Sequence, residues 1–241
     1  MAMYLPNVIE YPIIFFGAAI LGGIITTVNP KSSHEDLARY LKLSRAKYLV
    51  TTPSLAEKAF SAGVLKGMRS VFVIGQAEDC ESISSVLFED GAASTYPDDV
   101  KIDPKEDVVA LPFSSGTTGV SKGVMLTHYN LIAEVRILFK DGPPLEDVGV
   151  VLNVLPLYHI YGLAIIMTGR LHVGSKILLL SRFEPNTFLR AIQDYKVSTL
   201  SRGLLQQRIL HTTAIEAVLA DALLARHATF PLRLRGRLLL L

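Results

Sequence analysis

The segment from Leu111 to Val124 reads Leu-Pro-Phe-Ser-Ser-Gly-Thr-Thr-Gly-Val-Ser-Lys-Gly-Val, and it is the most informative stretch of the 241-residue chain. It combines hydroxyl side chains, glycines that expose backbone N–H groups, and one compact cation. These residues are Ser114, Ser115, Gly116, Thr117, Thr118, Gly119 and Lys122. An apolar run over 108–113 precedes them and predicts a strand that ends at the loop. The pattern therefore indicates a loop that binds a polyphosphate.

This loop matches neither of the two common phosphate-binding patterns. A Walker A loop has glycine before its lysine and Ser or Thr after it, whereas Ser121 and Gly123 flank Lys122 in this chain. The dinucleotide fingerprint requires a further glycine ahead of Gly116 and Gly119. A flexible surface turn is the alternative. Because such a turn needs neither a neighbouring strand nor a lysine, we prefer phosphate binding.

Outside the loop, short apolar runs alternate with amphipathic segments, which predicts an α/β fold. We expect mainly parallel sheets with helices on both faces. The expected strands cover residues 24–28, 48–51, 71–74, 108–113, 124–127, 150–155 and 176–180. The expected helices cover residues 12–21, 54–62, 82–88, 129–139, 160–171 and 185–195, and another follows the capping pattern Ser32-Ser33-His34-Glu35.

Residues 11–30 contain no charged side chain and are long enough to cross a bilayer. Pro12, the Gly22-Gly23 pair and Asn29 interrupt this segment, so we interpret it as a buried helix, a turn and a buried strand. The alternative is a membrane-associated protein that uses residues 11–30. A signal peptide is not expected, because Glu10 precedes the apolar run and no Lys or Arg does.

The composition favours a globular chain, with 50% hydrophobic residues, 19% charged residues and a formal net charge of +2. This balance gives no electrostatic reason to expect a nucleic-acid partner. The single Cys80 excludes an internal disulfide, which suits a reducing compartment, and we expect a cytoplasmic location. The histidines other than His159 lack metal-ligand spacing, so no metal site built from side chains is predicted. The terminal leucines provide no peroxisomal Ser-Lys-Leu signal.

The loop, written Ser-Ser-Gly-Thr-Thr-Gly-x-x-Lys-Gly, resembles the phosphate loop of the adenylate-forming (AMP-binding) superfamily of acyl-CoA synthetases, 4-coumarate–CoA ligases and luciferases. A second segment, Leu155-Pro156-Leu157-Tyr158-His159-Ile160-Tyr161-Gly162-Leu163, is similar to the Pro-x-x-His-x-x-Gly segment beside that family's acyl pocket. Thr26-Thr27-Val28-Asn29-Pro30 is a weaker third match. The three agree in order and spacing over about residues 3–199.

This resemblance implies an ATP-dependent carboxylate–CoA ligase, in which a fatty or aromatic acid forms an acyl-adenylate and then a CoA thioester. It implies ATP, Mg²⁺ and CoA as cofactors and co-substrates. It places Ser114 to Gly119 and Lys122 at the β- and γ-phosphates, and His159 where the acid meets the α-phosphate. Lys122 and His159 are the implied catalytic residues. It further implies that His159, Tyr161 and Ile165 contact the acyl substrate, and that Arg182 contacts CoA.

The chain departs from the family pattern after the histidine segment. The family's Tyr-Gly-x-Thr-Glu segment, its ribose-binding aspartate and its C-terminal lid domain with the adenylation lysine are not found in this sequence. We therefore expect residues 1–200 to form a partial N-terminal domain that is weakly active or inactive by itself. A non-catalytic nucleotide- or acyl-binding fragment is the alternative. Residues 201–241 hold six arginines and no lysine, and we interpret them as an atypical, disordered or aberrant tail.

Overall fold

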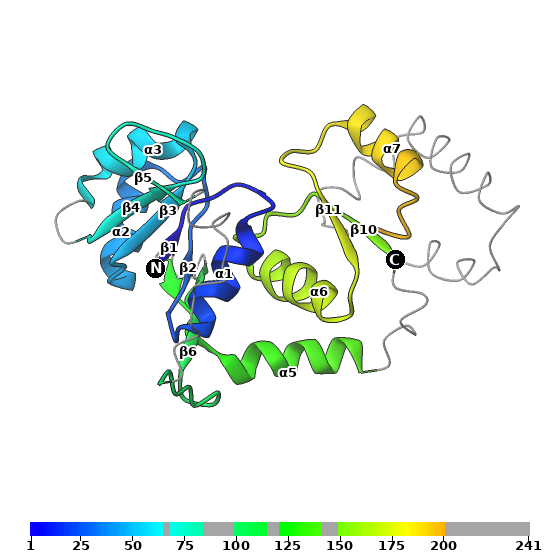
Figure 1. The fold of residues 1–241 in the computed structure, drawn as a ribbon, viewed down its shortest axis with the longest axis horizontal. Helices are drawn as coiled ribbons and strands as arrows, with labels where there is room; N and C mark the ends of the chain where they lie inside the picture. The colour runs from blue at the N-terminus through cyan, green and yellow to red at the C-terminus, as the bar shows by residue number, and fades with distance from the viewer. Residues whose placement is uncertain (65–67, 84–98, 115–120, 141–148, 201–241) are drawn as a thin grey trace, which may run out of the picture. The chain divides into compact units, whose positions relative to one another are not determined.

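A computed structural model describes residues 1–64, 68–83, 99–114, 121–140 and 149–200 (Figure 1). The chain divides into two compact units. The first comprises Met1–Val148 and Pro156–Gly174, and the second comprises Gly149–Leu155 and Ser175–Leu241. The tail predicted at 201–241 and most of the helix predicted at 82–88 lie outside the described residues.

The first unit is built on a five-stranded parallel sheet with the strand order β2-β1-β3-β4-β5. These strands are β1 (Ala2–Met3), β2 (Thr26–Thr27), β3 (Tyr48–Thr51), β4 (Ser70–Val73) and β5 (Glu81–Ser82). Both faces of β1 are buried, because Ala2 and Met3 point to opposite sides and neither is accessible to solvent. Helices α2 (His34–Ser44) and α3 (Pro53–Ala59) cover one face, and the π-helix η1 (Phe60–Val64) continues α3. Helix α1 (Tyr11–Ile20) lies on the other side of the sheet (Figure 1).

The expected helix, turn and strand of residues 11–30 are confirmed, although the strand is shorter than predicted. Helix α1 buries Tyr11, Ile14, Phe15 and Ala19, and β2 contains two residues where five were expected. Among the described residues, no helix is both long enough and apolar enough to span a membrane. Ser33 caps α2 by accepting a hydrogen bond from the Asp36 N–H at 3.0 Å, one residue later than the capping pattern predicted.

Two short antiparallel pairs, which the alternation of segments did not predict, follow this sheet along the chain. Strand β6 (Val108–Ala110) pairs with β9 (Leu126–Thr127), and β7 (Phe113–Ser114) pairs with β8 (Lys122–Gly123). The single strand predicted at 108–113 is therefore wrong, because Leu111 and Pro112 interrupt it. Pro112 has no N–H to donate to a ladder, and the carbonyl of Leu111 accepts from the Thr26 side chain.

Two helices complete the first unit and lie on either side of a pocket described below. Helix α5 (His128–Phe139) begins at a capping box in which Thr127 accepts from the Asn130 N–H at 3.2 Å. The helix predicted at 160–171 is present, but most of it is a π-helix, η4 (Tyr161–Gly169), followed by one turn of α6 (Arg170–His172). Such π-helical segments recur at functional sites.

The second unit has a three-stranded parallel sheet with the strand order β11-β10-β12. Its strands are β10 (Val150–Asn153), β11 (Lys176–Leu179) and β12 (Thr199–Leu200). Helix α7 (Pro185–Asp194) packs on the sheet through Phe188 and Ile192, which contact Leu152 in a buried cluster. Both main sheets are parallel, as the sequence predicted.

Candidate functional site

The hairpin β7–β8 brings the two ends of the predicted phosphate loop together. Ser114 lies directly opposite Lys122 in the antiparallel ladder, and Phe113 lies opposite Gly123. The side chains of Ser114 and Lys122 are exposed, so their hydroxyl and ammonium groups are available to a ligand. The intervening loop residues Ser115, Gly116, Thr117, Thr118 and Gly119 lie outside the described residues.

Tyr40 of helix α2 contacts Phe113 in β7 and Ser121, the residue that precedes β8. Its ring stacks on Phe113 with a centroid separation of 4.5 Å and an interplanar angle of 29°. Its hydroxyl forms a hydrogen bond with the Ser121 hydroxyl at 3.1 Å. One aromatic side chain therefore contacts a residue just before the loop and a residue just after it.

Two adjacent threonines on β2 bond to the residue that precedes the β7–β8 hairpin by two positions and to the residue before His159. Thr26 donates its hydroxyl to the Leu111 carbonyl at 2.8 Å, and Thr27 donates its hydroxyl to the Tyr158 carbonyl at 2.7 Å. Both threonines are buried, so each bond gives a buried hydroxyl the partner that it needs. Since consecutive strand residues point to opposite faces, one short strand fixes two distant segments at once.

The turn that carries His159 is fixed by close backbone contacts. The Leu157 N–H donates to the Asn7 side-chain oxygen at 2.9 Å, and the His159 N–H donates to the Pro156 carbonyl at 3.2 Å. Gly162 packs so tightly that a Cβ there would lie 2.1 Å from the Pro156 carbonyl oxygen. A glycine is therefore required at this position of the Pro-x-x-His-x-x-Gly segment.

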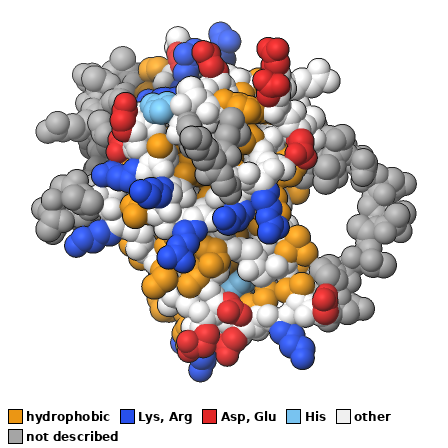
Figure 2. Space-filling model, turned by 90° about the vertical axis from the view of Figure 1, so that its left-hand side faces the viewer, with side chains coloured by type: hydrophobic (Ala, Val, Ile, Leu, Met, Phe, Trp, Pro, Cys, Tyr) orange, Lys and Arg blue, Asp and Glu red, His pale blue; other side chains and the backbone are white. Residues whose placement is uncertain are grey.

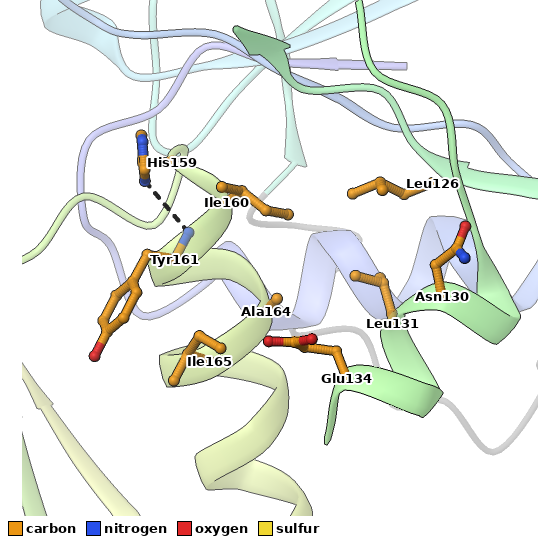
Figure 3. Close-up of a pocket in the computed structure, with 9 residues that line it drawn as sticks. All are labelled: Leu126, Asn130, Leu131, Glu134, His159, Ile160, Tyr161, Ala164 and Ile165. Carbon is orange, nitrogen blue, oxygen red and sulfur yellow. Dashed lines mark hydrogen bonds between the residues drawn. The ribbon is translucent and has the colours of Figure 1, made fainter. Parts of the chain in front are cut away.

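The His159 ring is exposed, and one of its nitrogens is occupied within the chain. Nδ1 accepts a hydrogen bond from the Tyr161 N–H at 3.3 Å (Figure 3). A neutral imidazole that accepts at Nδ1 carries its proton on Nε2. The arrangement leaves Nε2–H as the donor that His159 can present to a ligand.

A pocket of about 640 Å³ lies beside His159 (Figure 3). Its lining comes from two chain segments, β9 with α5 and the turn with η4. The first segment contributes Leu126, Asn130, Leu131 and Glu134. The second segment contributes His159, Ile160, Tyr161, Ala164 and Ile165. The mixture of apolar walls and a few polar groups is typical of a site for a small organic ligand.

Burial raises the pKa of two tyrosine hydroxyls near this turn. The Tyr11 hydroxyl is buried, and it has no hydrogen-bond partner within the described part of the chain. Burial raises the pKa of Tyr11, and nearby Tyr158 raises it further. Burial likewise raises the pKa of Tyr158, which is half-buried.

Cations are present near the site and on the surface. Arg170 lies over the Phe139 ring at 5.2 Å, and its burial lowers the pKa of the guanidinium, while the nearby Tyr161 raises it. On the surface shown in Figure 2, Lys and Arg side chains gather across the middle, with acidic side chains above and below.

Within the described ranges, no group of three or more His, Cys, Asp or Glu side chains could hold a metal ion.

The model of the AMP-binding enzyme family matches residues 1–202 of the chain. The chain belongs to the AMP-binding enzyme family. It is 41% identical over 201 residues to 4-coumarate–CoA ligase from Pinus taeda, and 38% identical over 201 residues to 4-coumarate–CoA ligase 2 from Petroselinum crispum. Each alignment covers 81% of this chain and 36% of the relative, so the chain spans about a third of the length of these ligases.

Solved structures of AMP-binding enzymes share the fold. A long-chain-fatty-acid–CoA ligase from Archaeoglobus fulgidus matches with a TM-score of 0.70 and 27% identity, over 83% of this chain and 38% of that one. A red-emitting luciferase from Phrixothrix hirtus matches with a TM-score of 0.75 and 20% identity, over 92% of this chain and 55% of that one. The α/β architecture predicted from the sequence is thus the N-terminal part of the adenylate-forming fold.

The predicted site residues of this AMP-binding family member fall into separate groups. Ser114 and Lys122 face each other across the hairpin, and neither lines the pocket. His159, Tyr161 and Ile165 line the pocket together. Arg182 belongs to the second unit, where it is exposed two residues ahead of Glu184. Hydrogen bonds from Thr187 and Asn186, and after them the charge of Arg182, lower the pKa of Glu184.

Sequence reasoning missed the α5 side of the pocket. The spacing predicted a helix over 129–139, but apolar residues occur on more than one face of it. Leu131 is buried, whereas Ile132 and Ile137 are exposed. The spacing of apolar residues along the helix therefore does not indicate which of its faces lines a pocket. Glu134 carried no motif that would have singled it out.

Proposed function

We propose that the chain carries the triphosphate site and part of the acid site of an ATP-dependent carboxylate–CoA ligase. The observation that supports this most directly is the pair of hydrogen bonds from β2. Thr26 and Thr27 bond to the backbone beside the Lys122 hairpin and beside the His159 pocket, respectively. A nucleotide-holding segment and an acid-holding segment are thereby fixed to one rigid element, as positioning catalysis requires.

In the proposed reaction, a carboxylate oxygen attacks the α-phosphorus of ATP, and the bond from that phosphorus to the bridging oxygen breaks. Pyrophosphate leaves and an acyl-adenylate remains. The thiol sulfur of CoA then attacks the acyl carbonyl, its proton is lost to solvent, and AMP leaves with the former carboxylate oxygen. No side chain of the protein is a nucleophile in either step.

The residues of the chain hold and orient the reactants. Lys122 places an ammonium against the β- and γ-phosphates, and Ser114 adds a hydroxyl donor opposite it. Nε2–H of His159 donates to the oxygen on which charge develops between acid and α-phosphate. Tyr161 and Ile165 contact the acyl group. Mg²⁺, when bound, neutralises phosphate oxygens, and the exposed hydroxyl of Ser114 and those of the loop suit its preference for oxygen ligands.

A binding and turnover experiment on the full chain tests this proposal. ATP affinity is measured by calorimetry, and pyrophosphate release is measured over a panel of fatty and aromatic acids with CoA present. Lys122→Ala should weaken ATP binding by about tenfold or more, because a charge-assisted bond is lost. His159→Ala should leave ATP affinity within about threefold while reducing acid-dependent pyrophosphate release. Lys105→Ala, which removes an exposed lysine over the Tyr129 ring, is the matched control.

The results separate the alternatives. ATP binding without release of pyrophosphate in the presence of any of the acids would favour the alternative of a non-catalytic nucleotide-binding fragment. Absence of ATP binding, or binding that Lys122→Ala leaves unchanged, would contradict the triphosphate site.

A further inference from the structure

Glu134 is the one carboxylate among the described residues that line the pocket. It comes from helix α5, and its side chain extends toward Ala164 of η4 (Figure 3). Most of the surrounding lining is apolar, from Leu126, Leu131 and Ile165. An acidic group in such surroundings requires a partner or water to satisfy its oxygens.

Figure 3 shows the Glu134 side chain on α5, apart from His159, which lies at the start of η4. Along α5, Glu134 follows Asn130 by four residues, which is about one helical turn or ~5.4 Å. Along η4, Ile165 follows Tyr161 by the same number of residues. Since His159 and Glu134 line the same pocket, a ligand that fills it with its carboxylate at His159 can extend its opposite end toward Glu134.

Beyond Glu134 the two helices close on each other. A Cβ at Gly169 would lie 2.4 Å from Cε2 of Phe139, so the ends of η4 and α5 are in direct contact. The residues of both helices that line the pocket, up to Glu134 and Ile165, all precede this contact along the chain. The Glu134 carboxylate is therefore the polar group of the lining that lies nearest to this contact along α5.

The carboxylate of Glu134 is available to a ligand. Across the described ranges, no ion pair and no hydrogen bond joins it to another side chain. It is half-buried, so water screens it less than it would a fully exposed glutamate. A donor on the ligand, and above all a cationic one, would form a charge-assisted hydrogen bond with it.

We propose that Glu134 is a specificity-determining residue that selects acids carrying a hydrogen-bond donor at the end remote from the carboxylate. A protonated amine is preferred to a hydroxyl, a hydroxyl to an unsubstituted end, and a second carboxylate is rejected by like charge. This assignment rests on the proposed function, because it takes the reacting carboxylate to lie at His159.

The test uses four acids that differ only at the remote end. They are 3-phenylpropanoic acid and its para-hydroxy, para-aminomethyl and para-carboxy derivatives, and their affinities for the full chain are measured by calorimetry. The wild-type chain should bind the aminomethyl acid at least about tenfold more tightly than the carboxy acid. Glu134→Lys should reverse that order. Glu134→Gln should remove the advantage of the amine over the unsubstituted acid while keeping the hydroxy acid within about threefold.

Glu106→Gln, at an exposed position outside the pocket, is the matched control and should keep the wild-type order. If Glu134→Lys fails to fold, as judged by its circular dichroism, the assignment is tested by comparing the affinities of wild type and Glu134→Gln for the four acids. An order of affinities that is the same in wild type and in the folded Glu134 variants would overturn the assignment while leaving acid binding, and hence the proposed function, intact. Failure of the wild-type chain to bind any of the four acids would overturn the acid site and this assignment together.

Discussion

Thr27 donates its buried hydroxyl to the backbone carbonyl of Tyr158 across 131 positions of sequence, at a distance of 2.7 Å. The acceptor is the residue immediately before His159. Thr27 is 4% exposed, so its hydroxyl has little access to water that could take the place of this bond. The position of the histidine turn therefore depends on a residue that contributes no group to the pocket.

Thr27→Val should reduce the free energy of unfolding by about 0.5–1.5 kcal/mol, because it keeps the shape of the side chain and removes the donor to the part-buried Tyr158 carbonyl. Urea denaturation followed by circular dichroism measures the change. Thr52→Val is the control, since the Thr52 hydroxyl contacts an exposed Ser54 hydroxyl and its loss should change stability by less than about 0.5 kcal/mol. Equal stabilities for the two variants would contradict the buried bond.

Two substitutions of Tyr40 can distinguish the contribution of its ring stacking from that of its hydrogen bond at the β7–β8 hairpin. Tyr40→Phe removes the bond to Ser121 and should reduce the free energy of unfolding by about 0.5–1.5 kcal/mol. Tyr40→Ala also removes the stacking on Phe113 and should be clearly less stable than Tyr40→Phe. Thermal unfolding compares them with Tyr48→Phe, in which an exposed bond from Arg69 is lost. The hairpin contact would be disproved by a Tyr40→Ala chain as stable as wild type.

Two glycines should respond in opposite directions to the same substitution. Gly162→Ala places a Cβ 2.1 Å from a backbone oxygen, so the turn must shift, and we expect a loss of at least about 3 kcal/mol in unfolding free energy. Gly17→Ala, in the exposed face of α1, meets no atom within 4 Å and should stabilise the chain by about 0.5–1 kcal/mol. Chemical denaturation of both variants tests the pair. A Gly162→Ala chain with wild-type stability would show that the turn is not closely packed.

Glu184 should make the stability of the second unit depend on pH in the acidic range. Its carboxylate caps α7 by accepting from the N–H groups of Asn186 and Thr187 at 3.0 and 2.6 Å, and hydrogen bonds from Thr187 and then Asn186 lower its pKa from the ordinary 4.5. A lowered pKa in the folded state means that the stabilisation is complete above the unfolded pKa and disappears as the pH falls through the folded pKa. The stability difference between wild type and Glu184→Gln should therefore be constant near neutrality and shrink below pH 4.5. A difference that does not vary with pH would show that the cap does not depend on charge.

Much of the fold could be predicted because local signals were strong. The β-branched and aromatic run at 48–51 is a strand, and a serine ahead of acidic residues caps α2. Strand β1 was missed because it has two residues, and a pattern of period two cannot be recognised in so short a run. The break at Leu111 and Pro112 depends on a hydroxyl 85 positions away, which no local pattern reveals.

Only those residues of the candidate site that lie in or next to a recognisable motif could be predicted from the sequence. His159 and Tyr161 belong to one recognisable segment and Ile165 follows it closely, and the structure places all three around one pocket. Glu134 and Tyr40 belong to no such segment, because the position of each depends on how helices pack against residues far away in the sequence. Long-range contacts of this kind are set by the whole fold and leave no periodic signal in the sequence.

The alternation of β2 has a consequence for changes in the length of the chain. Thr26 and Thr27 direct their hydroxyls to two different carbonyls because neighbouring residues of a strand face opposite ways. Adding or deleting a single residue ahead of them would exchange the two faces and break both bonds in one event. A substitution at either position removes one bond, whereas a change in length ahead of this strand removes both.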